Sequence, residues 1–329
     1  MNVRRRLIPA AALAGAFALG ATALTACSGS AGAAAGGKDG KLDVTASFYP
    51  MQFLAEQIGK DHVKVTTLTK PGVEPHDLEI TPKQTAQLGE ADVVLYLKSL
   101  QPAVDKAVAQ SGVKNVVDAA TLTQLEAHSA SGHESHESHE GQEHGASEEG
   151  HDHGEAGEDP HIWLDPVKFA EVAKGVGAAL EKADPDHAAD YGKNTADLLA
   201  KLTGLDGEFK EGLANTASKT FITTHSAFGY LAERYGLDQE GISGVDPESE
   251  PSPARMKDLQ AIAKKDNVTT VFFETLASDK TAKTLARDTG LQTDVLDPLE
   301  GITDTSQGAD YLEVMRSNLK NLRKALGAK

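Results

Sequence analysis

Two of the twelve histidines follow strand-like runs, and a third lies between helical elements. His76 follows the strand-like run HVKVTTL, His225 ends the run KTFITTH, and His161 lies just beyond an acidic stretch, in the sequence DPHIWLDP. In α/β proteins, ligands bind at loops that follow the carboxyl ends of the strands. A proline precedes both His76 and His161 and stiffens the backbone there. These three imidazoles therefore form a candidate metal site.

Four carboxylates stand close to these histidines or in the same kind of position. Glu274 follows the run VFF, and Asp297 follows TDVL and precedes a proline. Asp77 directly follows the first histidine and Asp165 lies four residues after the second, where a carboxylate would fix the tautomer of an imidazole. Three neutral imidazoles and one carboxylate suit a tetrahedral Zn²⁺ shell. On the residues alone, each of these side chains also fits a solvated loop, a helix cap or a turn.

A second group of histidines lies in a low-complexity stretch between His128 and Glu158. This stretch is rich in glutamate, has no lysine or arginine and holds almost nothing apolar, so it cannot bury enough surface to offset the entropy of ordering. We predict a disordered loop over about residues 128–158 that binds zinc weakly; the alternative is a plain solvated linker. The candidate weak sites are His128, His133, His136, His139, His144, His151 and His153.

The start of the chain has the pattern of an export signal. Three arginines precede an apolar run, and the sequence LTAC then resembles the lipobox of bacterial lipoproteins. We predict a signal peptide over residues 1–26, a lipid-modified Cys27 and a flexible tether over residues 27–40. Because Cys27 is the only cysteine, the chain forms no internal disulfide. We therefore expect a protein anchored by lipid to the outer face of the bacterial cell membrane.

The net charge of the chain limits the classes of partner that it is expected to bind. The formal net charge is −17. Nucleic acid is not expected as a partner, because phosphate binding needs a basic surface. A cation is a natural partner for so acidic a protein, although acidity also serves solubility.

The elements that must position the histidines alternate between short β-type runs and helical stretches from about residue 42. Two such halves flank a helical stretch without a strong stop. This pattern predicts an α/β fold with two lobes, each with a mostly parallel sheet covered by helices. We expect an N-terminal lobe over residues 41–185, a linker helix over residues 186–215 and a C-terminal lobe over residues 216–329.

Five motifs carry a family resemblance. GVEPHDLEITP, EDPHIWLDP, TTHSAFGYLAERYGL, FFETLAS and DVLDPLEG, in this order, resemble the zinc/manganese family of bacterial ABC-transporter solute-binding proteins, also called cluster A-I. The resemblance implies two α/β lobes joined by a single long helix, with a metal ion between them. It also implies that His76, His161 and His225 are ligands and that Asp297 is the fourth, with Glu274 as an alternative ligand or a support.

Two positions in the sequence bear on which metal ion is bound and which group is its fourth ligand. Manganese members of the family carry a carboxylate where this chain has His225, and imidazole favours Zn²⁺. Some zinc members have a ligating glutamate directly before the first histidine, where this chain has Pro75, with Glu74 one residue further back. This difference favours Asp297 or water as the fourth ligand.

The resemblance implies a monomeric high-affinity zinc receptor that hands Zn²⁺ to an ABC-type membrane permease and is not an enzyme. The alternatives are a manganese receptor of the same family, a metal-dependent surface adhesin and a zinc hydrolase with Glu274 as the base. The chain lacks the H-E-x-x-H motif of many zinc proteases, which argues against the hydrolase.

Overall fold

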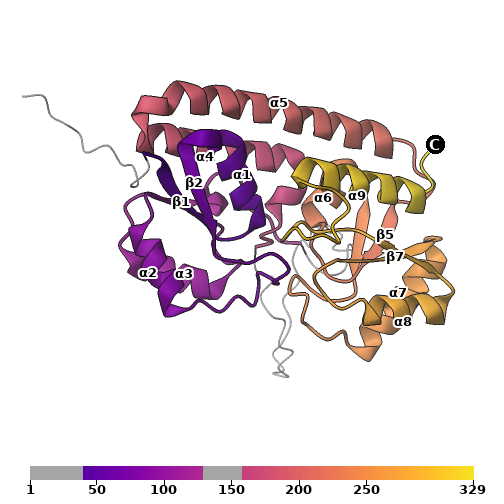
Figure 1. Cartoon of the computed structure of the whole chain (residues 1–329). Coiled ribbons are helices and arrows are strands. Elements are labelled where there is room, and N and C mark those ends of the chain that lie inside the picture. Colours follow the sequence, from indigo (N-terminus) through magenta and orange to yellow (C-terminus); the bar gives the residue numbers. More distant parts are fainter. Residues whose placement is uncertain (1–39, 129–157) are drawn as a thin grey trace, which may run out of the picture. The chain divides into compact units, whose positions relative to one another are not determined.

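Two parallel four-stranded sheets organise the chain in a computed structural model that describes residues 40–128 and 158–329 (Figure 1). The first sheet has the strand order β2-β1-β3-β4, and the second has the equivalent order β6-β5-β7-β8. All pairings are parallel, which confirms the predicted α/β class. The strands are β1 (Leu42–Ala46), β2 (Val63–Thr67), β3 (Val93–Tyr96), β4 (Val116–Asp118), β5 (Thr220–Thr223), β6 (Asp238–Gly241), β7 (Thr270–Phe273) and β8 (Gln292–Val295).

Helices follow the strands in each half of the chain. The central strands β1, β3 and β5 are almost wholly buried, as expected where helices cover both faces of a parallel sheet. The helices are α1 (Tyr49–Gly59), α2 (Pro82–Glu90), α3 (Pro102–Ser111), α4 (Pro166–Ala183), α5 (Ala188–Leu213), α6 (Gly229–Tyr235), α7 (Pro253–Lys265), α8 (Lys280–Thr289) and α9 (Tyr311–Ala325). Short 3₁₀ turns lie at Lys60–His62, Ala119–Thr121, Ile162–Leu164 and Pro185–His187.

Local sequence signals set where several helices begin. Helices α2, α4 and α7 each start with proline, whose fixed φ suits the first helical position. The residues just before them are Thr81, Asp165 and Ser252, and each side chain accepts a hydrogen bond from a backbone N–H of the first turn. These caps and prolines therefore fix the direction in which the chain enters each of the three helices.

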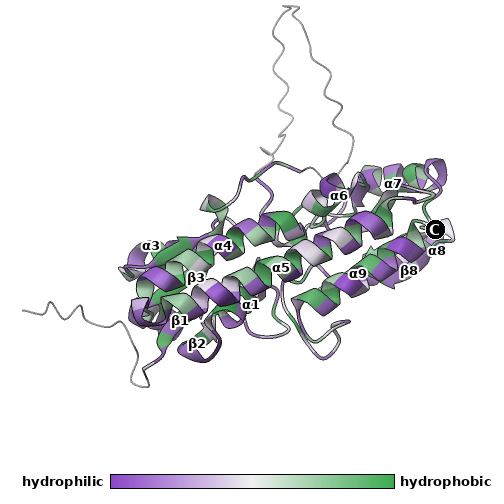
Figure 2. Cartoon of the chain, turned by 90° about the horizontal axis from the view of Figure 1, so that it is seen from above, coloured by the Kyte–Doolittle hydropathy of each residue, from purple (hydrophilic) through white to green (hydrophobic). Residues whose placement is uncertain are grey.

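Helix α5 runs alongside elements of both halves. It packs against α4 and α1 in the N-terminal half and against α9 in the C-terminal half (Figure 2). Its approach to α4 is close at Gly177, where a Cβ atom would lie 2.3 Å from Oγ1 of Thr195. Within residues 40–128 and 158–329, no helix, α5 included, is long and apolar enough to cross a membrane.

The two lobes share one hydrophobic core. Tyr311, at the start of α9, packs with tilted rings against Phe53 and Phe169 of the N-terminal lobe, at centroid distances of 5.2 and 4.6 Å. Its hydroxyl donates to the carbonyl oxygen of Trp163 at 2.6 Å, and the indole N–H of Trp163 donates to the carbonyl oxygen of Pro298 at 2.7 Å. Because close-packed cores resist deformation, groups held between the lobes keep a fixed geometry.

Candidate metal centre

Four side chains from four separate loops meet between the lobes. His76 lies in the irregular segment between β2 and α2, and His161 directly precedes the 3₁₀ turn Ile162–Leu164. His225 lies just after β5, and Glu300 lies five residues after the end of β8. Three of these loops follow parallel strands at their carboxyl ends, which is where such sheets place binding groups.

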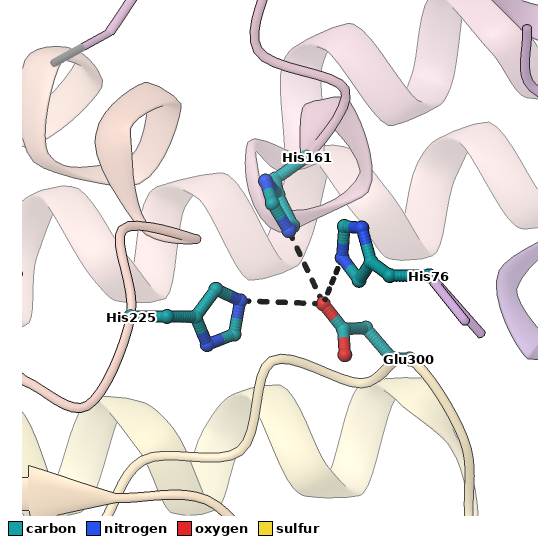
Figure 3. Close-up of side chains that lie close together, drawn as sticks. All are labelled: His76, His161, His225 and Glu300. Carbon is teal, nitrogen blue, oxygen red and sulfur yellow. Dashed lines mark hydrogen bonds and ion pairs between the residues drawn. The ribbon is translucent and has the colours of Figure 1, made fainter. Parts of the chain in front are cut away.

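The three imidazoles converge on a single carboxylate oxygen. The Nε2 atoms of His76, His161 and His225 lie 3.2, 3.1 and 3.4 Å from Oε1 of Glu300 (Figure 3). All four ligand atoms lie within 4.8 Å of one another. Two ligand atoms bound to one tetrahedral Zn²⁺ are about 3.3 Å apart, given bonds of about 2.0 Å. The distance from the Glu300 oxygen to each of the three nitrogens is therefore that expected between two ligands of one such shell.

The centre is buried, with one partly exposed member. The side chains of His161 and Glu300 are 0% exposed and that of His225 is 1% exposed, whereas that of His76 is 11% exposed. His76 also borders a surface pocket of about 460 Å³ that extends along α2 and α3. An ion reaching the centre would therefore meet His76 first.

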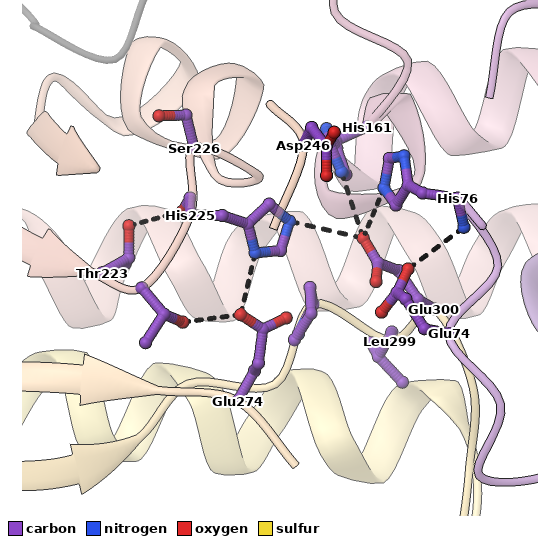
Figure 4. A network of polar contacts seen from close by, with 12 residues as sticks. Glu74, His76, His161, Thr223, His225, Ser226, Asp246, Glu274, Leu299 and Glu300 are labelled. Carbon is purple, nitrogen blue, oxygen red and sulfur yellow. Dashed lines mark hydrogen bonds and ion pairs between the residues drawn. The ribbon is translucent and has the colours of Figure 1, made fainter. Parts of the chain in front are cut away.

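Two buried carboxylates orient the imidazoles from behind. Nδ1 of His161 lies 2.7 Å from Oδ1 of Asp159. Nδ1 of His225 lies 2.9 Å from Oε1 of Glu274 (Figure 4), and this oxygen also accepts from the hydroxyl of Thr224. An ionised carboxylate only accepts hydrogen bonds, so each Nδ1 carries a hydrogen, and in the neutral imidazole the Nε2 lone pair is available to a metal ion. Burial lowers the pKa of both imidazoles, but attraction to their carboxylate partners outweighs it and raises both pKa values.

Glu300 carries the negative charge of the centre. Burial raises its pKa, but the contacts with His161, His225 and His76 outweigh burial and hold the pKa well below its usual value. Glu74 lies beside it, where burial and repulsion from Glu300 raise the pKa of Glu74 to about 9, so that this carboxyl group is uncharged at neutral pH.

The donor atoms of this centre suit a cation. Nε2 of His225 and Oε2 of Glu300 are buried and have no hydrogen-bond partner among the described residues. Such buried polar atoms are rare in native proteins and need an explanation. A metal ion bound by the three Nε2 atoms and the Glu300 carboxylate supplies one.

The structure differs from the sequence expectation at the fourth position. It does not bring Asp297 into the group with the three histidines; Glu300, three residues later in the same DVLDPLEG motif, lies there instead. The carboxylate of Asp297 accepts hydrogen bonds from the N–H of Leu299 at 2.8 Å and from the hydroxyl of Thr275 at 3.1 Å, so it shapes the turn. The motif contains two acidic residues, Asp297 and Glu300, and this second acid is the sequence signal that would have pointed to Glu300.

The acidic neighbours of the histidines also differ from expectation. Asp165 caps α4 and pairs with Arg234 at 2.6 Å, and the carboxylate on His161 is Asp159, two residues before the histidine. No hydrogen bond or ion pair joins Asp77 to His76 in the described part of the chain; Asp77 borders the surface pocket. Glu274 supports His225, which was one of its two expected roles.

Most of the remaining sequence predictions lie outside the described residues. These are the signal peptide, Cys27, the tether up to residue 39 and the histidines His133, His136, His139, His144, His151 and His153. His128 is described, and it differs from the expectation of a disordered loop residue. Its side chain is only 17% exposed and is held between Asp159 and Glu233.

Comparisons with known proteins agree with this geometry. Residues 44–325 match the family model of ZnuA, the periplasmic component A of a zinc-uptake complex. The chain is 37% identical over 295 residues to the high-affinity zinc uptake system protein ZnuA of Bacillus subtilis, covering 88% of this chain and 89% of that protein. It is 36% identical over 296 residues to the zinc-binding lipoprotein AdcA of Streptococcus pneumoniae, covering 87% of this chain but only 56% of AdcA, so it spans about half the length of that relative.

A solved structure of the zinc-bound ZnuA-like domain of AdcA superposes with a TM-score of 0.70 at 32% identity, covering 87% of this chain and 99% of that domain. The matched regions include both sheets and all four loops of the centre. The chain therefore belongs to the ZnuA family of zinc-uptake components.

Proposed function

We propose that this protein is an extracytoplasmic receptor that binds Zn²⁺ and delivers it to an ABC-type membrane permease. The observation that carries the proposal is the convergence of three Nε2 atoms on one Glu300 oxygen at 3.1–3.4 Å. His76, His161, His225 and Glu300 are the proposed ligands. Family membership and the zinc-related names of the relatives support the cargo.

The ligand chemistry favours zinc over manganese. Three imidazoles and a single carboxylate match the ligands that Zn²⁺ takes in tetrahedral sites, whereas Mn²⁺ prefers shells dominated by carboxylate, carbonyl and water oxygens. The affinity of an N/O site also rises from Mn²⁺ to Zn²⁺ in the general order of divalent metals. A manganese receptor and an adhesin are therefore less well supported.

The arrangement favours binding over catalysis. Catalytic zinc sites keep one position open for a water molecule, with a base close by. Here Glu300 is placed to fill the fourth position, and Glu274, the base that a hydrolase would use, is engaged by His225 and Thr224. We therefore propose a receptor without a catalytic role.

We propose that the ion enters and leaves past His76. This ligand is the most exposed of the four, and among the described residues the backbone hydrogen bonds of residues 70–80 are local, such as those from Val73 to Lys70 and from Leu78 to Pro75. The other three ligands are fully buried, and His161 and His225 are fixed by buried carboxylates. Movement of the His76 segment would open the shell without separating the shared core.

The setting of the receptor is also part of the proposal. We propose export by the signal sequence, a lipid anchor at Cys27 and a monomeric receptor; the N-terminal sequence pattern and the relative named as a lipoprotein support the first two. The proposed division into lobes at 41–185 and 216–329 with a linker helix over 186–215 is compatible with α5, which spans Ala188–Leu213.

A titration against a competing zinc chelator tests the proposed site. Trp163 is the only tryptophan, and its ring centroid lies 5.1 Å from that of His161, so its fluorescence reports on this centre. The wild-type protein should bind one Zn²⁺ tightly, and Glu300→Gln should lose that event. Glu211→Gln, which alters an exposed carboxylate on α5, is the matched control and should bind as the wild type does. Tight binding by the Glu300 variant would remove this residue from the ligand set.

Delivery is tested in the source bacterium. A chromosomal His225→Ala variant should grow poorly in medium with a zinc chelator, and added zinc should restore growth. Rescue by added manganese instead of zinc would support a manganese receptor.

A further inference from the structure

A second group of metal-ligand side chains lies outside the site just described. Glu126 and His128 precede the undescribed segment, and Glu233 comes from α6 in the other lobe. These three residues place one donor atom each within 4.8 Å of one another. Nε2 of His128 lies 3.2 Å from Oε2 of Glu233, close to the spacing of about 3.3 Å between ligands of one tetrahedral Zn²⁺.

The imidazole of His128 is held in place. Its Nδ1 lies 2.8 Å from Oδ2 of Asp159, and its ring meets the ring of Tyr230 edge-on at 4.4 Å. It rests on Gly229, where a Cβ atom would come within 2.5 Å of Cγ of His128, so only glycine leaves room for the ring. Because the acceptor Asp159 fixes the hydrogen on Nδ1, Nε2 is directed at Glu233, which is the arrangement of a metal-ligating histidine.

The backbone beside His128 is fixed as well. The N–H of Glu126 donates to the hydroxyl of Tyr230 at 2.8 Å, and that hydroxyl donates to the carbonyl oxygen of Asp159 at 2.8 Å. The N–H of Asp159 donates to the carbonyl oxygen of Glu126 at 2.8 Å. The group is therefore built on ordered backbone from both sides of the undescribed segment.

We propose that Glu126, His128 and Glu233 form a second, weaker site for Zn²⁺ or a similar divalent cation that bridges the two lobes. Three protein ligands with nitrogen and oxygen atoms leave one position for water. The site is weaker than the first because Lys168 already pairs with Glu126 at 2.7 Å and the Glu233 side chain is 61% exposed. The proposal goes beyond the proposed function, since it does not depend on which ion the first site holds.

The two sites share one carboxylate. Oδ1 of Asp159 engages His161 of the first site, and Oδ2 engages His128 of the second. Asp159→Asn should therefore weaken both sites, because an amide cannot accept from both imidazoles. Glu233→Gln should weaken only the second site. A rival reading has His128 as a doubly hydrogen-bonded imidazolium that binds no metal, and this reading predicts no ion at that position.

Crystals of the full-length protein grown in excess zinc chloride test the proposal directly. Anomalous difference maps at the zinc edge should show one peak between His76, His161, His225 and Glu300 and another between His128 and Glu233. The second peak should be absent in Glu233→Gln and strongly reduced in Gly229→Ala, and it should persist in the Glu211→Gln control. Absence of the second peak from the wild-type crystals overturns the proposal, as does its retention in Glu233→Gln.

Native mass spectrometry of the same full-length variants checks the result in solution. Glu233→Gln should carry one zinc ion fewer than the wild type at intermediate zinc concentration and should keep the tightly bound ion. An unchanged number of ions in Glu233→Gln counts against the second site alone. A missing tight ion in the wild type would instead count against the proposed receptor function, so the two failures are distinguishable.

Discussion

The side chain of Asp297 accepts a hydrogen bond from the backbone N–H of Leu299 at 2.8 Å, and this contact shapes the turn that carries Glu300 to the three histidines. Leu299 lies in the left-handed region with φ 57°, which is uncommon for a residue with a branched side chain. Asp297, at the start of this turn, therefore positions Glu300, at its end.

This relationship predicts different effects for the two acids. Glu300→Gln should weaken zinc binding by more than about 100-fold, because a ligand is lost, whereas Asp297→Asn should cost no more than about 10–100-fold, as expected of a residue that positions a ligand. The amide oxygen of Asn can still accept from Leu299. Competition with a zinc chelator measures both. A larger loss for Asp297→Asn than for Glu300→Gln would make Asp297 the ligand.

The three histidines should differ in their effect on stability. Each change to alanine should abolish tight zinc binding. His161→Ala also removes one imidazole partner from the buried Asp159, which keeps His128 and the backbone N–H of residue 161. The cost should therefore lie below the about 3–5 kcal/mol of leaving a buried charge unpaired. His76→Ala should cost far less, since this side chain is partly exposed and its backbone stays bonded to Glu74.

Urea unfolding of the metal-free variants measures how much each change lowers stability, apart from its effect on zinc affinity. His187→Gln, a partly exposed histidine outside both metal clusters of the described residues, is the control and should change neither quantity greatly. Equal destabilisation by His76→Ala and His161→Ala would show that the Asp159 pair contributes little.

Zinc should outcompete manganese at the first site by several orders of magnitude. The three imidazoles and the general order of divalent-metal affinities act in the same direction. One protein sample is equilibrated with both ions, and metal analysis of the protein fraction then gives the ratio of bound zinc to bound manganese. Equal occupancy would contradict the assignment of zinc as cargo.

Replacement of residues 129–157 by a short Gly/Ser linker should leave the fold and the tight site intact. The flanking chain is already held by the hydrogen bond from Asp159 to Glu126, and loop length changes closure entropy by only about 0.6 kcal/mol per doubling. The variant should lose the weak ions of the loop histidines and should keep the ion proposed at His128.

The weak loop ions should also disappear below about pH 6 in the wild-type protein. Solvated imidazoles have pKa values of about 6.5, so they gain protons below that pH and stop binding metal. Calorimetry at two pH values compares the wild type with the linker variant. Loss of the tight event in the linker variant would place loop residues in the primary site.

The sequence by itself determined the class of the protein and three of the four side chains that we propose as ligands. Apolar runs alternate with helical stretches because strands and helices bury side chains with different periods, and this alternation is local enough to be seen without a structure. The positions of His76, His161 and His225 followed from the same logic, since they lie beside elements whose ends can be located in the sequence.

Tertiary structure decided which acids serve these histidines. Asp159 lies two residues before His161 and Asp165 lies four residues after it, and either separation allows a contact with the imidazole. Asp297 and Glu300 likewise share one motif. The choice depends on the direction of each side chain, which hydrogen bonds in the turns and the helix cap set. The proposed second site depends on tertiary structure even more, because α6 brings Glu233 to His128 across 105 residues of chain through packing between the lobes.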